Sequence, residues 1–177
     1  MKLNQHGLSA VRQLGTIVLS RAVLAIGTVK SGFNTTNALI YAIDGVIRSL
    51  AAQTSTALTA LADAFYVQPA NTTVYYTLAV NAAGTVRCIQ GDFAGRQKFV
   101  GGVEVRGDGN IPDVPDLSVA STDANGVQTL SDQWCPFGVI KVVTGATTFT
   151  PGTTLFDAAN VTTTFFDVAF LPANERL

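Results

Sequence analysis

Side chains able to do chemistry are few in this chain and are spread far apart. His6 is the only histidine, and its position near the start means that the end of the chain would have to hold any general base in place. A Ser–His–Asp arrangement needs that base within hydrogen-bond reach of a nucleophile. The sequence also contains no G-x-S-x-G, G-x-x-x-x-G-K-[ST], G-x-G-x-x-G or H-E-x-x-H pattern. We therefore predict that the protein has no catalytic residues and is not an enzyme.

Acidic residues are the one remaining source of catalytic or ligand-binding groups. Four of them lie in or beside residues 107–126, a segment rich in turn formers: Asp113, Asp116, Asp123 and Asp132. Paired carboxylates can hydrolyse a glycosidic bond, and carboxylate oxygens can bind Ca²⁺. The run from Asp123 to Gly126 lacks the rest of an EF-hand pattern. A cation site, a glycan contact and a solvated loop all stay open, and the solvated loop is our preferred interpretation.

The two cysteines, Cys88 and Cys135, are 47 positions apart and fit neither a zinc framework nor a disulfide scaffold. Free cysteine commonly behaves as a small buried hydrophobic residue. One histidine and two distant thiols cannot supply the usual ligands of a transition metal. We predict two buried free thiols, no metal site and no cofactor.

The charge content points to a protein with covered surfaces. Charged residues make up only 13% of the 177 residues although 47% are hydrophobic, whereas charged residues usually make up about 25%. Either partner proteins cover part of the surface, or uncharged polar residues occupy it in place of charged ones. The net charge of −1 gives no electrostatic basis for binding nucleic acid. Basic residues prevail in residues 1–60 and acids in residues 107–177, which would favour head-to-tail or lattice contacts unless the spacing is chance.

The start of the chain does not resemble an export signal, because Lys2 is followed by polar residues. The apolar stretch Thr16–Gly27 is interrupted by Arg21 and is shorter than the roughly 20 residues that span a bilayer. We expect a protein made in the cytoplasm with no membrane partner.

Residues 7–27 have the apolar spacing of a helix, with Leu8, Val11, Leu14 and Val18 at steps of three and four. Further apolar residues widen the stripe, which is typical of a segment buried against something else. We predict a helical or extended arm over residues 1–33. The candidate contact residues are Leu8, Val11, Leu14, Val18, Arg21, Ile26 and, from the end of the chain, Phe165.

From Thr36 onward the pattern is that of strands. Asn37–Ile43 and Val46–Ala52 flank Asp44-Gly45, the strongest short-range signal for a β-hairpin. Val74–Asn81 alternates, with Val74, Tyr76, Leu78 and Val80 predicted inward, and a loop then leads to a second hairpin strand at Thr85–Gln90.

Other segments are less regular. Phe99–Val105 reads as a strand with a bulge at Gly101-Gly102, and Ala57–Phe65 fits a helix or a strand. Phe137–Val143 and Thr163–Leu171 are predicted strands. In the second of them Phe166, Val168 and Phe170 are predicted to share the inward face, which leaves Phe165 outward beside Asp167. The whole pattern predicts a mainly β, antiparallel β-sandwich or jelly-roll-like domain over residues 34–177.

Four stretches carry a resemblance to a known group of proteins. They are LSRAVLAIG, the hairpin NALIYAIDGV, a G-V-I-x-V-V strand and the ending TTFTPGTTLFDAANVTTTFFDVAF. Together they resemble small virion proteins of tailed bacteriophages that decorate or cement the capsid shell or form head fibres. The resemblance covers roughly residues 18–50 and 137–171.

The resemblance implies a β-sandwich or jelly-roll domain that assembles as a dimer or trimer on the outer shell, with the major capsid protein as its partner. It implies no catalytic residue. We accordingly expect a virion structural protein on the outer capsid surface that stabilises the shell by bridging major capsid subunits. The alternatives are a tail, baseplate or head-fibre protein that binds a host-surface glycan, or a glycan hydrolase that uses the loop carboxylates.

Overall fold

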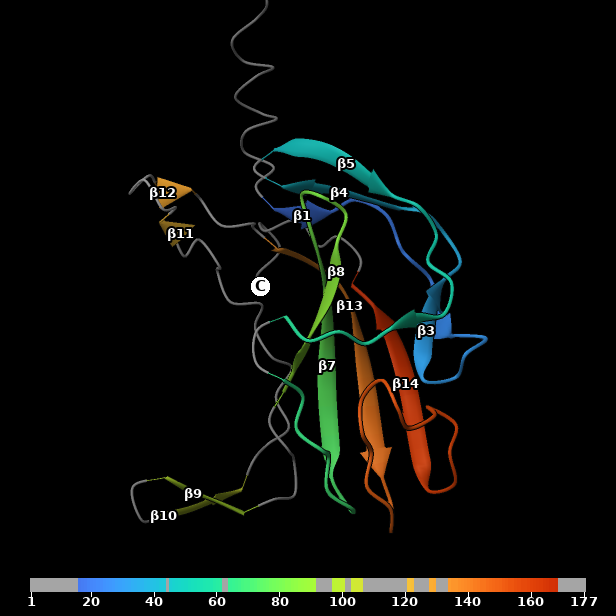
Figure 1. Cartoon of the computed structure of the whole chain (residues 1–177), viewed down its shortest axis with the longest axis vertical. Helices are drawn as coiled ribbons and strands as arrows, with labels where there is room; N and C mark the ends of the chain where they lie inside the picture. Colours follow the sequence, from blue (N-terminus) through green and yellow to red (C-terminus); the bar gives the residue numbers. More distant parts are fainter. Residues whose placement is uncertain are drawn as a thin grey trace, which may run out of the picture.

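The computed structural model of the chain (Figure 1) describes residues 16–43, 45–61, 64–91, 97–100, 103–106, 121–122, 128–129 and 134–168. These residues form strands and loops and contain no helix. Three antiparallel sheets of three or four strands make up most of the fold, and two further strand pairs complete the set. The strands are β1 (Ile17–Val18), β2 (Leu24–Ile26), β3 (Gly32–Thr35), β4 (Leu39–Ile43), β5 (Val46–Leu50), β6 (Thr56–Ala57), β7 (Thr73–Asn81), β8 (Val86–Gln90), β9 (Gln97–Val100), β10 (Val103–Arg106), β11 (Ser121–Thr122), β12 (Gln128–Thr129), β13 (Trp134–Thr144) and β14 (Val161–Asp167).

The largest sheet has the strand order β14-β13-β7-β8 (Figure 1). Its inward face follows from the alternation of β7, whose Val74, Tyr76, Leu78 and Val80 are fully buried as predicted. The predicted hairpin between β7 and β8 is confirmed, with Val80 paired to Val86. β13 lies between β7 and β14, so apolar residues on its inward face are covered on both sides.

A smaller sheet, β1-β4-β5, packs over one end of the large sheet. The predicted hairpin at Asp44-Gly45 is confirmed, because Ile43 pairs with Val46 and Gly45 has a φ of 74°. Tyr41 belongs to the same buried cluster as the inward residues of β7 and β13, and its hydroxyl donates to the Asn81 carbonyl at 2.9 Å. The hairpin is therefore fastened to the end of β7 by packing and by a hydrogen bond.

The third sheet, β2-β3-β6, lies beside β14, with the Leu24 N–H donating to the Asp167 carboxylate at 3.0 Å. A tight turn joins β2 to β3, in which the Gly27 N–H donates to the Gly32 carbonyl at 2.8 Å. A Cβ at Gly27 would lie 2.8 Å from that carbonyl oxygen, so the turn requires glycine there.

The prediction of a helix over residues 7–27 is wrong for residues 16–27, which are extended; residues 7–15 lie outside the described residues. β1 pairs with β4 and β2 pairs with β3, so neighbouring stretches of the predicted helix belong to two different sheets. The apolar residues on several sides of this segment are explained by burial in two sheets, because each strand must cover a different part of the core.

Two further predictions are corrected. Val100 pairs with Val103 in an antiparallel pair, so Phe99–Val105 belongs to two paired strands, β9 and β10, rather than to one bulged strand. Phe165 and Phe166 face opposite ways from the prediction: Phe165 packs against the core, and Phe166 is exposed. The cause is the register, because Phe165 pairs with Ile140 of the core and Phe166 with Val139. The ambiguous segment 57–65 begins with the end of β6 and continues as loop, with residues 62–63 outside the described set.

The other end of the large sheet is closed by loops and by a row of aromatic rings. Successive ring centroids along this row lie 5.6–6.2 Å apart. The row runs through Phe65, Tyr76, Phe149, Phe156 and Phe165. Phe149 and Phe156 come from the connection between β13 and β14, which explains why that Thr- and Gly-rich stretch folds back over the sheet.

Candidate interaction surfaces

Exposed apolar side chains stand out on the described surface. No group of three or more His, Cys, Asp or Glu gathers among the described residues. Exposed large hydrophobic residues instead occur on the small sheet, on the β2–β3 turn with the connection that faces it, and on the loop before β7. Clusters of this kind mark binding surfaces more often than scattered single residues do.

The first surface, the hairpin-tip patch, consists of Val29 and Leu155. Val29 is 60% exposed on the β2–β3 turn, and Leu155 is 45% exposed on the β13–β14 connection. The Phe156 N–H donates to the Lys30 carbonyl at 2.8 Å, so Val29 and Leu155 are each the neighbour in sequence of a residue in that bond. Two loops that are distant in sequence thus present one apolar patch.

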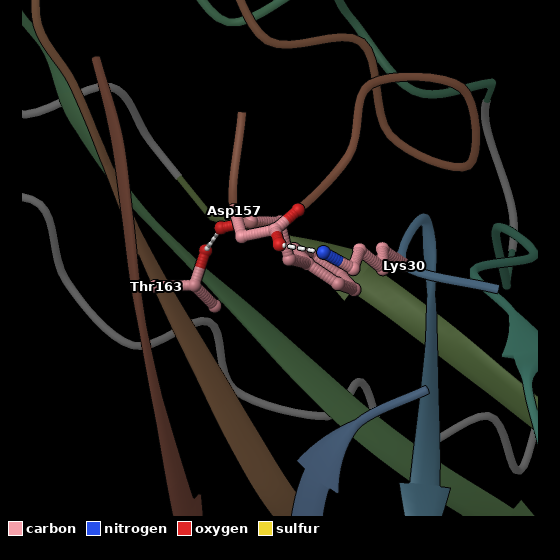
Figure 2. Close-up of polar contacts among 4 residues, drawn as sticks. Lys30, Asp157 and Thr163 are labelled. Atoms are coloured by element: carbon pink, nitrogen blue, oxygen red, sulfur yellow. Dashed lines mark hydrogen bonds and ion pairs between the residues drawn. The ribbon is translucent and has the colours of Figure 1, made fainter. Parts of the chain in front are cut away.

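Polar contacts fix both loops of the hairpin-tip patch in place (Figure 2). Lys30 and Asp157 form an ion pair, and the Thr163 hydroxyl donates to the Phe156 carbonyl at 2.9 Å. On the far side of the turn, the Val29 N–H donates to the Ser55 hydroxyl at 3.0 Å. The ion pair itself is half exposed and contributes little stability, about 0–1 kcal/mol. The Lys30–Asp157 pair instead links the β2–β3 turn to the β13–β14 connection and helps to hold the two loops in position.

The second surface is the loop before β7, where Tyr66 is 69% exposed. The side chain of Gln90 accepts from the Tyr66 N–H and donates to the Tyr66 carbonyl, each at 2.8 Å. The same amide donates to the Tyr76 hydroxyl at 3.3 Å, and that hydroxyl donates to the buried Gln68 at 3.2 Å. A hydrogen-bonded chain therefore runs from the core to the backbone beneath an exposed tyrosine.

The third surface is the small sheet β1-β4-β5. Ile40 and Ile47 are exposed on its outward face, and Val46 is exposed at the end of β5. Ala42 lies between Ile17 and Ile47 in the register but is fully buried, so the exposed apolar residues of this face are Ile40 and Ile47. Arg48, the one charged residue of β5, alternates to the other face with Tyr41.

The predicted contact residues are divided by the structure. Val18 is buried in the core, and Ile26 is half-buried in β2 and packs against the core. Arg21 is exposed between β1 and β2. Phe165, predicted to face outward, packs edge-to-face on Phe156 with ring centroids 5.7 Å apart. Leu8, Val11 and Leu14 lie outside the described residues, as do Asp113, Asp116, Asp123 and Asp132.

Sequence reasoning did not select Val29, Leu155 or Tyr66, and only the tertiary structure identifies them. A valine or leucine in a turn carries no periodic signal. Its exposure depends on where the turn docks, and the docking partners here are more than 100 positions apart in the chain. Glycines on both sides of Val29 were the only local hint of a tight turn.

The two cysteines are buried and free, as predicted. Cys135 pairs with Val80 on one side of β7, and Cys88 pairs with Leu78 on the other, so a whole strand lies between them. Burial raises the pKa of the Cys135 thiol to about 12, and burial also raises the pKa of Cys88. Neither thiol is a nucleophile near neutral pH, because the reactive form is the thiolate.

Comparison with known proteins finds no matching family model, no similar curated protein and no similar solved structure. In the described part of the chain, no helix has the length and apolar character to cross a membrane.

Proposed function

We propose that this protein is a non-enzymatic virion structural protein that binds the outer capsid shell and stabilises it by bridging neighbouring major capsid subunits. The observation that carries the proposal is the hairpin-tip patch, in which two exposed apolar side chains are presented by loops that are already locked together. Ordering loops on binding costs free energy, so a patch that is rigid beforehand keeps more of its binding energy.

The sparse charge of the chain supports the same proposal. Residues in the centre of a protein interface are depleted in charge and enriched in large apolar and aromatic side chains. Val29 and Leu155 have this character, with the Lys30–Asp157 pair between their loops as a polar contact. A small patch binds weakly by itself, but many copies on a repetitive shell gain avidity when each copy touches two subunits.

The architecture expected of such a protein is a sandwich of the jelly-roll kind. Packing of the small sheet over one end of the large sheet supports this part of the proposal, since Leu39 and Tyr41 share one buried cluster with Leu78 and Ile140. In the proposed assembly the protein forms a dimer or trimer, and Leu8, Val11 and Leu14 contact a neighbouring subunit.

The glycan-binding alternative depended on exposed aromatic residues, and the described residues offer it less than the sequence did. Phe165 packs inside the aromatic row, and Lys141 lies over the half-buried Tyr75 ring with its amine 5.8 Å from the centroid. The acidic segment 107–126 lies outside the described residues. We therefore keep shell binding as the proposed function.

Co-sedimentation with empty shells of the phage that encodes the chain tests the proposal. Wild-type protein should pellet with the shells, and a Val29→Asp, Leu155→Asp double variant should lose binding by about tenfold or more, because it places charge in the apolar contact. Val67→Asp is the matched control, as another exposed valine on a loop. It should bind like the wild type.

Two results would contradict the proposal. Wild-type protein that stays in the supernatant at all shell concentrations would exclude shell binding. Full binding by the double variant, with an unchanged unfolding midpoint, would exclude the hairpin-tip patch as the contact. Low-resolution imaging of the particle that carries the protein would show directly whether it lies on the shell, the tail or a fibre.

A further inference from the structure

β5 is an open edge strand among the sheets of the described chain (Figure 1). In the small sheet it pairs with β4 on one side and with no described strand on the other. The edge of β8 is covered at Cys88, whose N–H and carbonyl bond to Thr59 and Leu61. The edge of β14 is contacted at its last residue, where the Asp167 carboxylate accepts from the Leu24 N–H of β2. An open edge strand is a template for pairing with another strand.

The direction of the free backbone groups follows from the register. The Ile40 carbonyl accepts from Leu19 and the Ile40 N–H donates to the Ser20 hydroxyl, so the main-chain groups of Ile40 point towards β1. Ser49 lies opposite Ile40, and Ile47 lies opposite Ala42. Because the main-chain groups of Ile40 point towards β1, Ile40 and Ser49 form a non-hydrogen-bonded pair, and so do Ala42 and Ile47, two positions further along. In an antiparallel pair of this kind, the N–H and C=O groups of the two residues point away from each other. The main-chain groups of Ile47 and Ser49 therefore point to the open edge.

β5 lacks lysine, proline and a bulge, although its one charged residue, Arg48, lies on the inward face with Tyr41. Its five residues contain no proline, its pairing with β4 is continuous without a bulge, and its outward side chains are Ile47 and Ser49. Natural edge strands are commonly protected by Lys, Pro or a bulge. Ile47 is 59% exposed, and Ile40 continues the apolar face on β4.

We propose that β5 pairs antiparallel with β5 of a second copy of this chain, which joins two three-stranded sheets into one continuous sheet across a two-fold axis. We place Ile47 opposite Ile47 of the second copy, a register that pairs Val46, Ile47 and Arg48 and sets Ser49 opposite Gly45 of the neighbouring hairpin. It places Arg48 opposite Val46, and it lets the edge-facing groups of Ile47 bond to their own counterparts. A register centred on Arg48 would place two like charges directly opposite, which destabilises a pair.

A second copy fits this edge better than an unrelated partner, because β5 is complementary to itself in that register. The apolar outward face continues across the axis without a charge, and Ile47 gains an apolar neighbour at the point where its own sheet ends. The interface is small, so we expect a dissociation constant of roughly 1–100 µM. Salt should change it little, because no outward-facing charge takes part.

Sedimentation velocity of the full chain from roughly 5 to 500 µM tests the pairing over the expected range. We expect a reversible monomer–dimer equilibrium for the wild type. Ile47→Glu places two carboxylates opposite each other and should weaken the dimer by about tenfold or more. Val29→Glu is the matched control, since Val29 is 60% exposed and lies away from β5, and it should dimerise like the wild type.

Ser49→Pro tests the backbone part of the proposal. The Ser49 N–H points to the open edge, so proline removes a bond only from the dimer and is tolerated by an edge strand. It should abolish dimerisation with little change in the unfolding midpoint, whereas Ser49→Ala should leave dimerisation intact.

Cysteine cross-linking tests the register of the two strands. Ile47→Cys should form a dimer disulfide on oxidation, because paired Cα atoms lie about 5.5 Å apart, and Ser49→Cys should not.

Three results would overturn the inference. The first is a wild-type protein that stays monomeric at the highest concentration. The second is a dimer that neither Ile47→Glu nor Ser49→Pro weakens. The third is a monomer that Ser49→Pro destabilises, because another segment of the same chain then occupies the edge. Dimerisation is measured without shells. Failure of shell binding and failure of β5 pairing are therefore separate outcomes.

Discussion

The two ends of the large sheet are closed in different ways. At the end near Thr73 and Thr144, loops fold over the sheet and satisfy its polar groups from within: the fully buried Gln68 donates to the Thr72 and Val142 carbonyls at 3.1 Å. At the end near Asn81, a separate three-stranded sheet supplies apolar cover and finishes in the unpaired edge of β5. The first end is complete in one chain, whereas the second ends in groups that a partner can complete.

The difference shows how a chain with few charges separates stability from recognition. Buried polar groups are costly unless paired, so the loop end depends on every member of its network. At the small-sheet end, the buried Nε of Arg48 has no hydrogen-bond partner among the described residues. We expect substitutions at the loop end to affect folding and substitutions along β5 to affect association.

The largest effect should come from deleting residues 1–27. That deletion removes β1 and β2 together with the buried Val18 and Ala22, and so opens both the small sheet and the sheet beside β14. The loss should exceed the whole stability of a typical domain, about 5–15 kcal/mol, and leave the protein unfolded or insoluble. Deletion of residues 2–15 keeps every described strand and should leave a cooperative thermal unfolding transition by circular dichroism. Two equally stable truncations would show that β1 and β2 are dispensable.

The next effect tests the loop end. Gln68→Ala removes the partner of two buried carbonyls and of the Tyr76 hydroxyl, and it leaves a cavity. We expect a loss of about 3–4 kcal/mol in urea unfolding. Gln53→Ala, which removes a more exposed amide that donates to Ala51, is the control and should cost less than about 1 kcal/mol. Equal costs at both positions would mean that the buried network adds no stability.

Sequence patterns predicted the elements whose neighbours are close in the chain. The Asp44-Gly45 hairpin and the alternation of β7 are local signals, and both were correct. The helix predicted over residues 7–27 is wrong for residues 16–27, because β1 and β2 pair with strands of different sheets and no short window of sequence shows this. Phe165 was placed on the wrong face because Asp167 turns inward to accept the Leu24 N–H. Gln68 gave no signal either, since a single polar residue before Pro69 resembles any loop.

A smaller effect comes from alkaline pH. The unfolded Cys135 thiol ionises near pH 9, but the folded one stays protonated until about pH 12. Between these values the unfolded state binds fewer protons than the folded state. The contribution of this thiol to the free energy of unfolding is therefore constant below about pH 9 and falls as the pH rises above it. One pKa unit is about 1.4 kcal/mol, so this thiol should cost up to about 2 kcal/mol at pH 10.5.

Urea unfolding of wild-type protein and Cys135→Ala at pH 7 and at pH 10.5 measures this contribution of the small-sheet end. The variant should be less stable at pH 7, because it leaves a cavity, but should lose less stability on going to pH 10.5. Parallel losses in the two proteins would show that Cys135 is not the group responsible.

The smallest effect concerns the joint between the small sheet and the sheet beside β14. Val23 connects β1 to β2 with a φ of 54°, a left-handed conformation that is strained for a β-branched residue. Two main-chain bonds and one bond to a side chain hold it there: the Ala22 and Val23 carbonyls accept from the Asn37 and Thr36 N–H groups, and the N–H of the next residue, Leu24, donates to the Asp167 carboxylate. Val23→Gly releases a strain of about 1–3 kcal/mol but adds about 0.5–1 kcal/mol of unfolded-state entropy. We expect a net gain of about 1 kcal/mol in urea unfolding. Val29→Gly, at an exposed valine without positive φ, should give no gain, and a loss of stability in Val23→Gly would mean that contacts of the valine side chain outweigh the backbone strain.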